Sequence, residues 1–266
     1  MTRKHLLAEL TWYEARERLS AQPVVLLPFG SQEEQGPHAP MGDYLIAERI
    51  AADVARRADA LAAPVVPFGY ADYFRPFPGA ISLRPETFSL LCEDMCIALL
   101  DRGIERLVVL NGHSGNYPLV DHVVRKLKAA RGVLIPCINL WRIVPASLMQ
   151  ELYGDRAADA PGHGADPLTS VYLHLFPEHM RLDLIEHRPR KQALGLPIAG
   201  FSGVRFQGAE VHLPLDGDEI CDTGIVGGDP TLASADKGRR IYEFVVDYCA
   251  AFVAHFATVS PRVGTR

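Results

Sequence analysis

Short apolar runs separated by helical patterns are the feature of this sequence that most restricts its fold. Four such runs, rich in Val, Ile and Leu, hardly alternate with polar residues, which is typical of strands buried on both faces of a sheet. The predicted strands are Val24–Leu27, Val65–Pro67, Arg106–Leu110 and Val133–Ile138. Apolar residues at three- and four-residue steps predict helices between them, at about 45–58, 86–102 and 117–131. This alternation predicts an α/β fold of three layers, in which helices cover both faces of a mostly parallel central sheet.

The second half of the chain has a less regular pattern. Asp166-Pro167 predicts the start of a helix, with Asp166 as the N-cap and Pro167 at the first helical position. The stretch 188–230 is rich in Gly and Pro, and we expect it to form loops and short hairpins. Asp229-Pro230 predicts the start of a long final helix that ends near residue 257. Because no linker divides the chain, we expect residues 1–266 to form a single domain.

Composition and charge exclude several functional classes. The net charge is −5 and the basic clusters are short, which argues against a nucleic-acid partner. No uninterrupted apolar run reaches the ~20 residues of a spanning helix, and the N-terminus lacks the apolar segment of a signal peptide. The five cysteines show no zinc-type pairing, and Cys92 and Cys96 fit reduced thiols on a buried helix face. We therefore expect a cytoplasmic protein with no membrane partner.

A polar loop follows the first predicted strand. Within GSQEEQGPHAPMGD it holds Glu33, Glu34, His38 and Asp43. Ligands of open parallel sheets gather beyond the carboxyl ends of the strands, which is where this loop begins. Carboxylates and an imidazole in one loop suit a divalent ion such as Zn²⁺ or Mn²⁺. A solvated acidic surface loop is the alternative, and this segment taken alone favours that alternative.

A second polar segment, Asn111–Asn116, follows the third predicted strand. Its glycines permit a close backbone approach and present His113 at the same edge of the sheet. An imidazole in this position suits a metal ligand or an acid–base group. The alternative is a strand-to-helix turn in which Asn and Ser side chains only cap backbone groups. A phosphate-binding loop is not favoured, because the Lys and the spacing of a Walker motif are missing.

A third group of polar residues lies after the fourth predicted strand, which ends at Trp141. His163 stands between two glycines, outside any regular pattern, so it can serve as a proton shuttle or as a second metal ligand. An ordinary loop histidine is the open alternative. We interpret Asp166 mainly as a helix N-cap.

These segments together resemble the creatininase (creatinine amidohydrolase) family. GSQEEQGPHAPMGDYLIAERIA is similar to that family's Gly-Ser-x-Glu-x-His-Gly-Pro-His loop, and LNGHSGN is similar to its Asn-Gly-His turn. PGAISLRPETFSLL resembles its substrate-side loop and helix, GHGADPLTS its His-containing segment, and GIVGGDPTLASADKG its C-terminal Gly-Asp-Pro signature. The five motifs keep their order from residue 24 to about residue 245. This order makes the resemblance specific, although each motif alone is weak.

The resemblance implies a creatininase-like fold, usually assembled as a homo-hexamer, with a divalent metal centre that hydrolyses small amides. Glu33, Asp43 and His113 match the family's metal ligands at those positions. The metal that these ligands imply is zinc or manganese, with iron as a further option.

The resemblance also implies roles for residues around the metal. His163 matches a histidine linked to proton transfer, and Trp141 lies near the place of an aromatic residue that covers the substrate. We add Glu34 to the expected catalytic residues. Ser82, in the substrate-side loop, and His38 complete the expected substrate-binding residues.

Three departures from the family pattern bear on the number of metals. Gln35 stands where the family has a second-metal histidine. Gly115 and Leu168 stand where different members supply a carboxylate. The loop between His38 and Asp43 is also one residue short. We therefore expect one tight metal site per chain. A second site would need replacement ligands, for which the candidates are Glu34, His38, His163 and Asp166.

We expect a metal-dependent amidohydrolase that cleaves a non-peptide or cyclic C–N bond of a small molecule by metal-activated water. Creatinine itself is not favoured, because the second-site changes alter the pocket where the substrate sits. Two biosynthetic activities of the family are alternatives, namely a formamidopyrimidine deformylase and a peptidase that trims a cofactor precursor. A non-catalytic small-molecule binder that kept the fold is the alternative from a different class.

Overall fold

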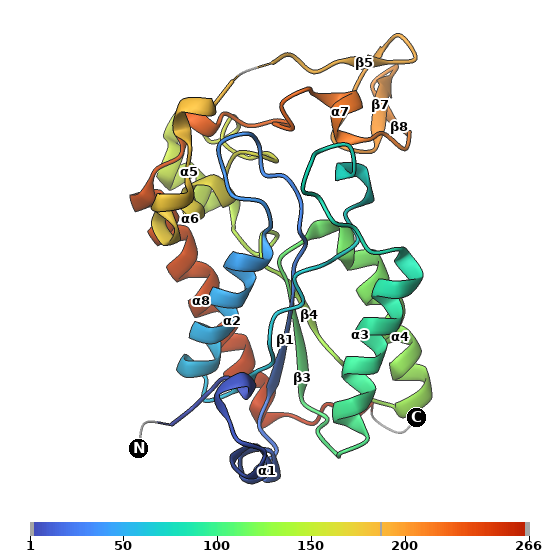
Figure 1. The fold of residues 1–266 in the computed structure, drawn as a ribbon, viewed down its shortest axis with the longest axis vertical. Coiled ribbons are helices and arrows are strands. Elements are labelled where there is room, and N and C mark those ends of the chain that lie inside the picture. Colours follow the sequence, from blue (N-terminus) through green and yellow to red (C-terminus); the bar gives the residue numbers. More distant parts are fainter. Residues whose placement is uncertain (1–2, 187, 264–266) are drawn as a thin grey trace.

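A four-stranded parallel sheet forms the centre of the computed structural model, which describes residues 3–186 and 188–263. The strand order is β2-β1-β3-β4 (Figure 1). The strands are β1 (Val25–Phe29), β2 (Leu61–Ala62), β3 (Leu107–Asn111) and β4 (Cys137–Asn139). Phe29 pairs with Asn111, so β1 and β3 end level with each other. After β1 the chain forms β2 on one side of it and then crosses to form β3 on the other side. The carboxyl ends of β1 and β3 are therefore the switch point of the sheet, which is where ligands of such sheets bind.

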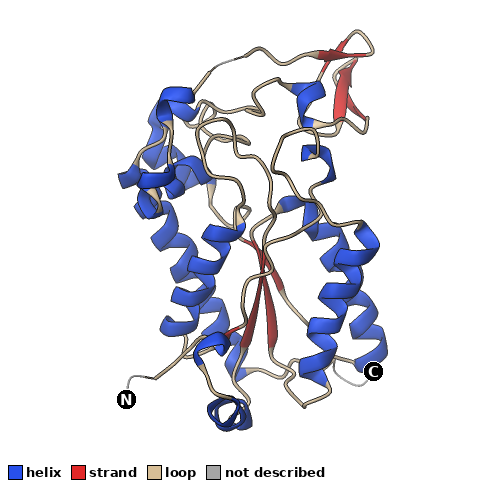
Figure 2. Ribbon diagram, in the orientation of Figure 1, coloured by secondary structure: helices blue, strands red, loops and turns tan. Residues whose placement is uncertain are grey.

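Two layers of helices cover the sheet, as the three-layer α/β prediction requires (Figure 2). Leu26 and Val108 point into a core with one layer, and Leu27 and Val109 point into a core with the other. The first layer is formed by α2 (Tyr44–Arg57), α6 (Leu168–Leu175) and α8 (Ala235–Thr258), and the second by α3 (Pro85–Leu100) and α4 (Tyr117–Arg131). Because both faces of the strands are buried, apolar residues do not alternate with polar ones along them. Each fully buried aliphatic side chain contributes about 1.5–3 kcal/mol to folding.

The remaining elements lie around this sandwich. Two hairpins and α7 stand beyond the carboxyl ends of the strands, on the side where the polar loops emerge (Figure 1). The elements are α1 (Trp12–Ser20), α5 (Ala146–Tyr153), α7 (Gly217–Ile220), β5 (Gln192–Ala193), β6 (Leu196–Pro197), β7 (Gly203–Phe206) and β8 (Ala209–His212). The short hairpins agree with the prediction for the Gly- and Pro-rich stretch.

Two of the predicted strands are placed differently in the structure. The second strand is Leu61–Ala62 rather than Val65–Pro67, although Val66 forms an isolated bridge with Phe29. Prolines on both sides of the Val65-Val66 pair remove backbone donors and stop a longer ladder there. The fourth strand begins only at Cys137, directly after Pro136, for the same reason.

Two of the predicted helix starts are also corrected. The final helix begins at Ala235 rather than at Asp229-Pro230, with Ser234 as its N-cap. Asp229 instead caps a separate short turn, where its carboxylate accepts a hydrogen bond from Thr231 N. α6 begins at Leu168, one residue later than predicted, but Asp166 Oδ1 still accepts a hydrogen bond from Ser170 N at 2.8 Å in the first turn.

Helix α8 is the one helix among the described residues that is long and apolar enough to cross a membrane. By length and composition this 24-residue helix could span a membrane, although its apolar residues are interrupted by charges. In the structure Ile241, Val245 and Cys249 of α8 are fully buried in the core, and the helix packs against α2 and α6. A buried core helix of a globular protein can be as long and as apolar as a membrane-spanning helix.

Candidate metal centre and cavity

The three predicted metal ligands meet at the switch point of the sheet. Glu33 comes from the loop after β1, His113 follows β3, and Asp43 is the residue before α2. All three residues are buried: Glu33 and His113 are each 3% exposed, and Asp43 is 1% exposed. Because β1 and β3 end level, the loops that follow them carry Glu33 and His113 to one place.

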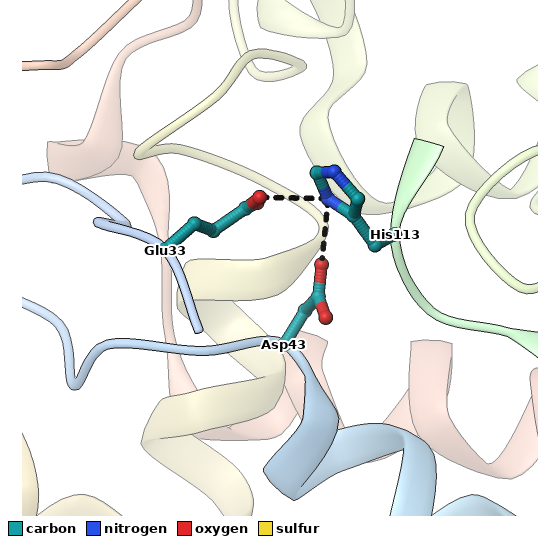
Figure 3. Close-up of side chains that lie close together, drawn as sticks. All are labelled: Glu33, Asp43 and His113. Atoms are coloured by element: carbon teal, nitrogen blue, oxygen red, sulfur yellow. Dashed lines mark ion pairs between the residues drawn. The ribbon is translucent and has the colours of Figure 1, made fainter. Parts of the chain in front are cut away.

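The geometry of this cluster is shown in Figure 3. His113 Nδ1 lies 2.7 Å from Glu33 Oε2 and 3.2 Å from Asp43 Oδ2. One ligand atom from each residue lies within 4.8 Å of the others. Within residues 3–186 and 188–263, no other group of three or more His, Cys, Asp or Glu side chains comes together in this way.

The electrostatics of the cluster call for a positive charge at its centre. Burial alone would lower the pKa of His113, but the Glu33 and Asp43 carboxylates raise it well above its usual value. Burial raises the pKa of Asp43, and the neighbouring Glu33 charge raises it further. Two carboxylates in one buried site are stable only with a compensating cation, which is either the imidazolium proton or a divalent metal.

Two observations show that these residues fit a metal ion. Glu33 Oε2 is buried and has no hydrogen-bond donor, although it faces His113 Nδ1. The other ring nitrogen, His113 Nε2, donates to the Tyr70 carbonyl at 2.9 Å, which leaves the Nδ1 lone pair free to bind a metal in the neutral ring. The buried Glu33, Asp43 and His113 triad could therefore hold a divalent metal.

Both carboxylate oxygens of Asp43 accept hydrogen bonds from Ser31. Its Oδ1 accepts a hydrogen bond from Ser31 N at 2.7 Å, and its Oδ2 accepts one from the Ser31 hydroxyl at 3.2 Å. It also precedes the first residue of α2, where the helix dipole favours a negative charge. The carboxylate is thus ordered by its surroundings before any metal binds.

A cavity of about 280 Å³ opens next to the metal ligands. Four aromatic side chains form much of its wall, namely Tyr73, Phe74, Trp141 and Phe201. The rings of Tyr73, Phe74 and Phe201 lie 4.6–5.7 Å apart, which is the spacing of packed aromatic pairs. No Lys or Arg is among the lining residues that the structure describes. The cavity therefore suits a small, flat molecule that is neutral or positively charged.

His163 lies on the cavity wall and pairs with Glu34. Its Nε2 is 2.7 Å from Glu34 Oε1, and its ring stacks on Phe74 at a centroid distance of 4.3 Å. Burial alone would lower the pKa of His163, but the Glu34 carboxylate raises it overall. The backbone of His163 exchanges two hydrogen bonds with Val226, so this glycine-flanked residue is held firmly. With Nε2 against Glu34, Nδ1 is the nitrogen that can exchange a proton with a molecule in the cavity.

Glu34 stands behind His163 rather than in the cavity lining. Its Oε2 accepts a hydrogen bond from Gly36 N at 2.6 Å, and its side chain closely approaches Gly224. Glu34 thus contacts the ring of His163 and does not line the cavity itself.

The predicted substrate-binding residues have different surroundings. Trp141 lines the cavity, where its Nε1 donates to the Gly112 carbonyl at 2.6 Å. Ser82 is outside the lining, and its hydroxyl accepts a hydrogen bond from Ala71 N at 3.0 Å. His38 is also outside, with Nε2 3.3 Å from the Thr169 hydroxyl, and burial lowers its pKa to about 4. Ser82 and His38 therefore support loops near the site.

The positions of the missing second-metal ligands are occupied by other contacts. Gln35 Nε2 donates to Glu33 Oε1 at 2.8 Å, and Leu168 contributes an apolar wall. At Gly115 an added Cβ would lie 2.5 Å from the Tyr70 carbonyl oxygen, so the backbone excludes a side chain there. Asp166, one candidate replacement, lines the cavity but accepts hydrogen bonds from the Tyr153 hydroxyl and Ser170 N.

Three cavity residues were not identified from the sequence. Tyr73 and Phe74 lie in a short helical turn between β2 and α3, and Phe201 lies between β6 and β7. The available signal was the aromatic-rich run YADYF beside Gly and Pro. Nothing in the local pattern near Phe201 indicates that it meets Phe74.

Comparison with known proteins agrees with this site. The family described as "Creatininase: Creatinine amidohydrolase" matches residues 8–253. The chain is 32% identical to a creatinine amidohydrolase of Pseudomonas putida over 206 residues, covering 71% of this chain and 79% of that protein. It is 29% identical to the mycofactocin precursor peptide peptidase of Mycolicibacterium smegmatis over 246 residues, covering 89% of this chain and 86% of that protein.

Solved structures give the same result. Creatininase in a Zn-Zn form, as a mutant, and in a manganese form each match with a TM-score of 0.78 and 26% identity, over 97% of this chain and all of the other. These relatives thus bind zinc or manganese in the same fold. With a family match over nearly the whole chain, this fold and the buried triad, the protein belongs to the creatininase family of hydrolases, which act on C–N bonds.

Proposed function

We propose that this protein hydrolyses the C–N bond of a small non-peptide or cyclic amide, with one metal held by Glu33, Asp43 and His113. The observation that carries the proposal is the buried triad in an aromatic cavity whose described lining includes His163 but no Lys or Arg. A zinc, manganese or iron ion in this triad would supply Lewis acidity, which acidifies water and polarises a carbonyl oxygen.

The side chains of the protein account for the other requirements of amide hydrolysis. The aromatic wall binds a flat substrate and excludes bulk water. Glu34 raises the pKa of His163, which favours its protonated form, and the Nδ1 proton can then pass to the leaving nitrogen. Without that proton the nitrogen would leave as an anion, which is a poor leaving group.

A peptidase is the second candidate, supported by the similarity to the mycofactocin precursor peptide peptidase. A deformylase acting on a phosphorylated formamidopyrimidine is disfavoured, because the described cavity lining has no Lys or Arg to pair with phosphate.

A metal-reloading experiment tests the proposed function. Protein stripped by a chelator is reloaded separately with Zn²⁺, Mn²⁺ or Fe²⁺ and assayed with lactams, imides, primary amides and short peptides. We expect turnover of at least one lactam or primary amide, dependent on added metal. Peptide cleavage alone would establish the second candidate. A loaded protein that binds amides without turning any over would be the non-catalytic binder.

The number of metal ions is a separate prediction. We propose one tightly bound metal per chain after dialysis against a weak chelator, with any second ion exchangeable. The second position lacks ligands, and removing even an outer-shell group typically costs about 10–100-fold in metal affinity. Gln35→His alone should not create tight binding of two metals, because the backbone around Gly115 still excludes a carboxylate. Elemental analysis that finds two equivalents surviving dialysis in the native protein would contradict this prediction.

The expected homo-hexamer gives a further prediction. Trp12 and Tyr13 on α1 are 64% and 59% exposed, and Phe206 and Val211 on the β7–β8 hairpin are each 50% exposed. Apolar side chains grouped at two ends of the molecule are typical of subunit contacts. We expect light scattering at micromolar concentration to give at least three times the 29.2 kDa mass of one chain. A monomer under these conditions would rule out the assembly.

A further inference from the structure

Gln35 holds an unusual position beside the metal triad. It lies two residues after Glu33, is only 2% exposed, and lines the cavity. Its Nε2 donates to Glu33 Oε1 at 2.8 Å. The reverse orientation of the amide would place its oxygen against a carboxylate oxygen, so this contact determines which end of the amide faces Glu33.

The other end of this amide has no partner. Among the residues that the structure describes, five buried side-chain nitrogen or oxygen atoms make no hydrogen bond, and Gln35 Oε1 is one of them. Glu33 Oε2, another of the five, is accounted for by the metal that the triad could hold. A buried acceptor without a donor is unfavourable, and native proteins rarely retain one without a functional reason. Gln35 Oε1 therefore lacks a donor, and the residue that carries it lines the cavity.

A second cation is a poor occupant of this position. The backbone at Tyr70 excludes a side chain at Gly115, and Leu168 contributes an apolar surface to the same cavity. The Gln35 amide oxygen is neutral, and a neutral amide oxygen is a weak ligand for zinc. It is a good acceptor for an N–H group.

We propose that Gln35 Oε1 accepts a hydrogen bond from an N–H group of the substrate, and that this contact selects amides whose N–H and carbonyl oxygen lie on the same side. This inference rests on the proposed function, because it assumes that the substrate carbonyl faces the metal triad. Gln35 contacts Glu33 directly, so the acceptor and the triad are neighbours in the cavity.

The geometry of amides then defines the substrate class. Peptide bonds are almost always trans, so their N–H and C=O groups point in opposite directions. In lactams and primary amides an N–H lies on the same side as the carbonyl oxygen. A substrate of this kind can offer its oxygen to the triad and its N–H to Gln35 together. Gln35 thus favours lactams and primary amides over linear peptides.

Small amide probes test this role in the zinc-loaded protein. The probes are γ-butyrolactam, its N-methyl derivative, acetamide and N-methylacetamide, and dissociation constants are measured by NMR titration. We expect the native protein to bind γ-butyrolactam about tenfold more tightly than the N-methyl lactam, the effect of one hydrogen bond to a buried acceptor. Acetamide should likewise bind more tightly than N-methylacetamide, whose only N–H points away from its carbonyl oxygen.

Substitutions separate the hydrogen bond from steric fit. Gln35→Met keeps the length of the side chain but removes its acceptor, so both preferences should disappear. Steric rejection of the extra methyl group would survive this change and would overturn the proposal. Gln35→Asn keeps an amide but shortens the side chain by one methylene group, which moves the acceptor away from the substrate. This variant should also lose both preferences for the unmethylated amides, and it tests the proposal even if Gln35→Met folds poorly. Gln32→Met in the same loop is the matched control, because Gln32 is outside the cavity lining, and it should keep them.

Metal content and turnover distinguish the possible failures. A second metal equivalent that is present in the native protein and absent from Gln35→Met would show that Gln35 is a metal ligand and would overturn the proposal. Equal binding of both lactams to a native protein that hydrolyses amides would overturn the role of Gln35 alone. The expected binding preferences in a protein that hydrolyses no amide would support the role of Gln35 and reject the proposed hydrolysis.

Discussion

Replacing His113 with alanine is expected to remove the bound metal and to lower kcat/KM by at least about 1000-fold while the fold persists. His113 Nδ1 is one of only three ligand atoms in the cluster, and the carboxylates left behind would repel each other without it. Lewis acidity is worth several kcal/mol of transition-state stabilisation, and each 1.36 kcal/mol corresponds to about tenfold in rate.

The fold should survive because His113 lies just after β3 and outside the two main apolar cores. Circular dichroism would report the fold and elemental analysis the metal. His122→Ala, at an exposed position on α4, is the matched control and should keep full metal content. Unchanged metal content in His113→Ala would show that His113 is not a ligand.

Replacing His163 with glutamine is expected to lower kcat about 10²–10⁴-fold, the usual contribution of a general acid, while one metal equivalent stays bound. His163 faces the cavity but is not part of the triad, so its loss should affect proton transfer rather than metal binding. His179→Gln, at an exposed position, is the control and should leave kcat unchanged. Loss of metal in His163→Gln would instead make His163 a metal ligand.

The pH dependence of the reaction should reveal the role of Glu34. A general acid acts while protonated, so activity should be high below the pKa of His163 and fall as the pH rises through it. Glu34 raises this pKa, and Glu34→Gln should therefore move the alkaline limb of the kcat profile to lower pH. A purely structural role for Glu34 would lower activity at every pH without moving the limb. Metal content is measured in parallel, because Glu34 is next to Glu33 in the chain.

Local sequence patterns were enough to determine the frame of the site. Non-alternating apolar runs become β1 and β3 because both faces of these strands are buried under helices. Parallel strands end at one edge, so polar residues directly after them are brought together whatever the details of the loops. For this reason Glu33 and His113 could be placed in one cluster before the structure was known. The family resemblance then selected Glu33 and Asp43 from the polar residues of the loop, and His113, as the metal ligands.

Contacts between loops were decided only by the tertiary structure. Phe201 comes from a segment far from Tyr73 and Phe74 in the chain, and their packing depends on how the hairpin region stands beyond the carboxyl ends of the strands. Ser82 was expected in the cavity but supports the loop behind it. Loop side chains have no periodicity that reports their neighbours, so local pattern carries no information about these contacts.

Gln35 shows the same division within one residue. From the sequence alone it could be recognised as a departure from the family's histidine, and hence as evidence against a second metal. Only the folded chain places its Nε2 on Glu33 and leaves its Oε1 buried without a donor. The type of residue present is a property of the sequence. Which atoms of that residue are satisfied depends on every segment packed around it, and only the tertiary structure brings those segments together.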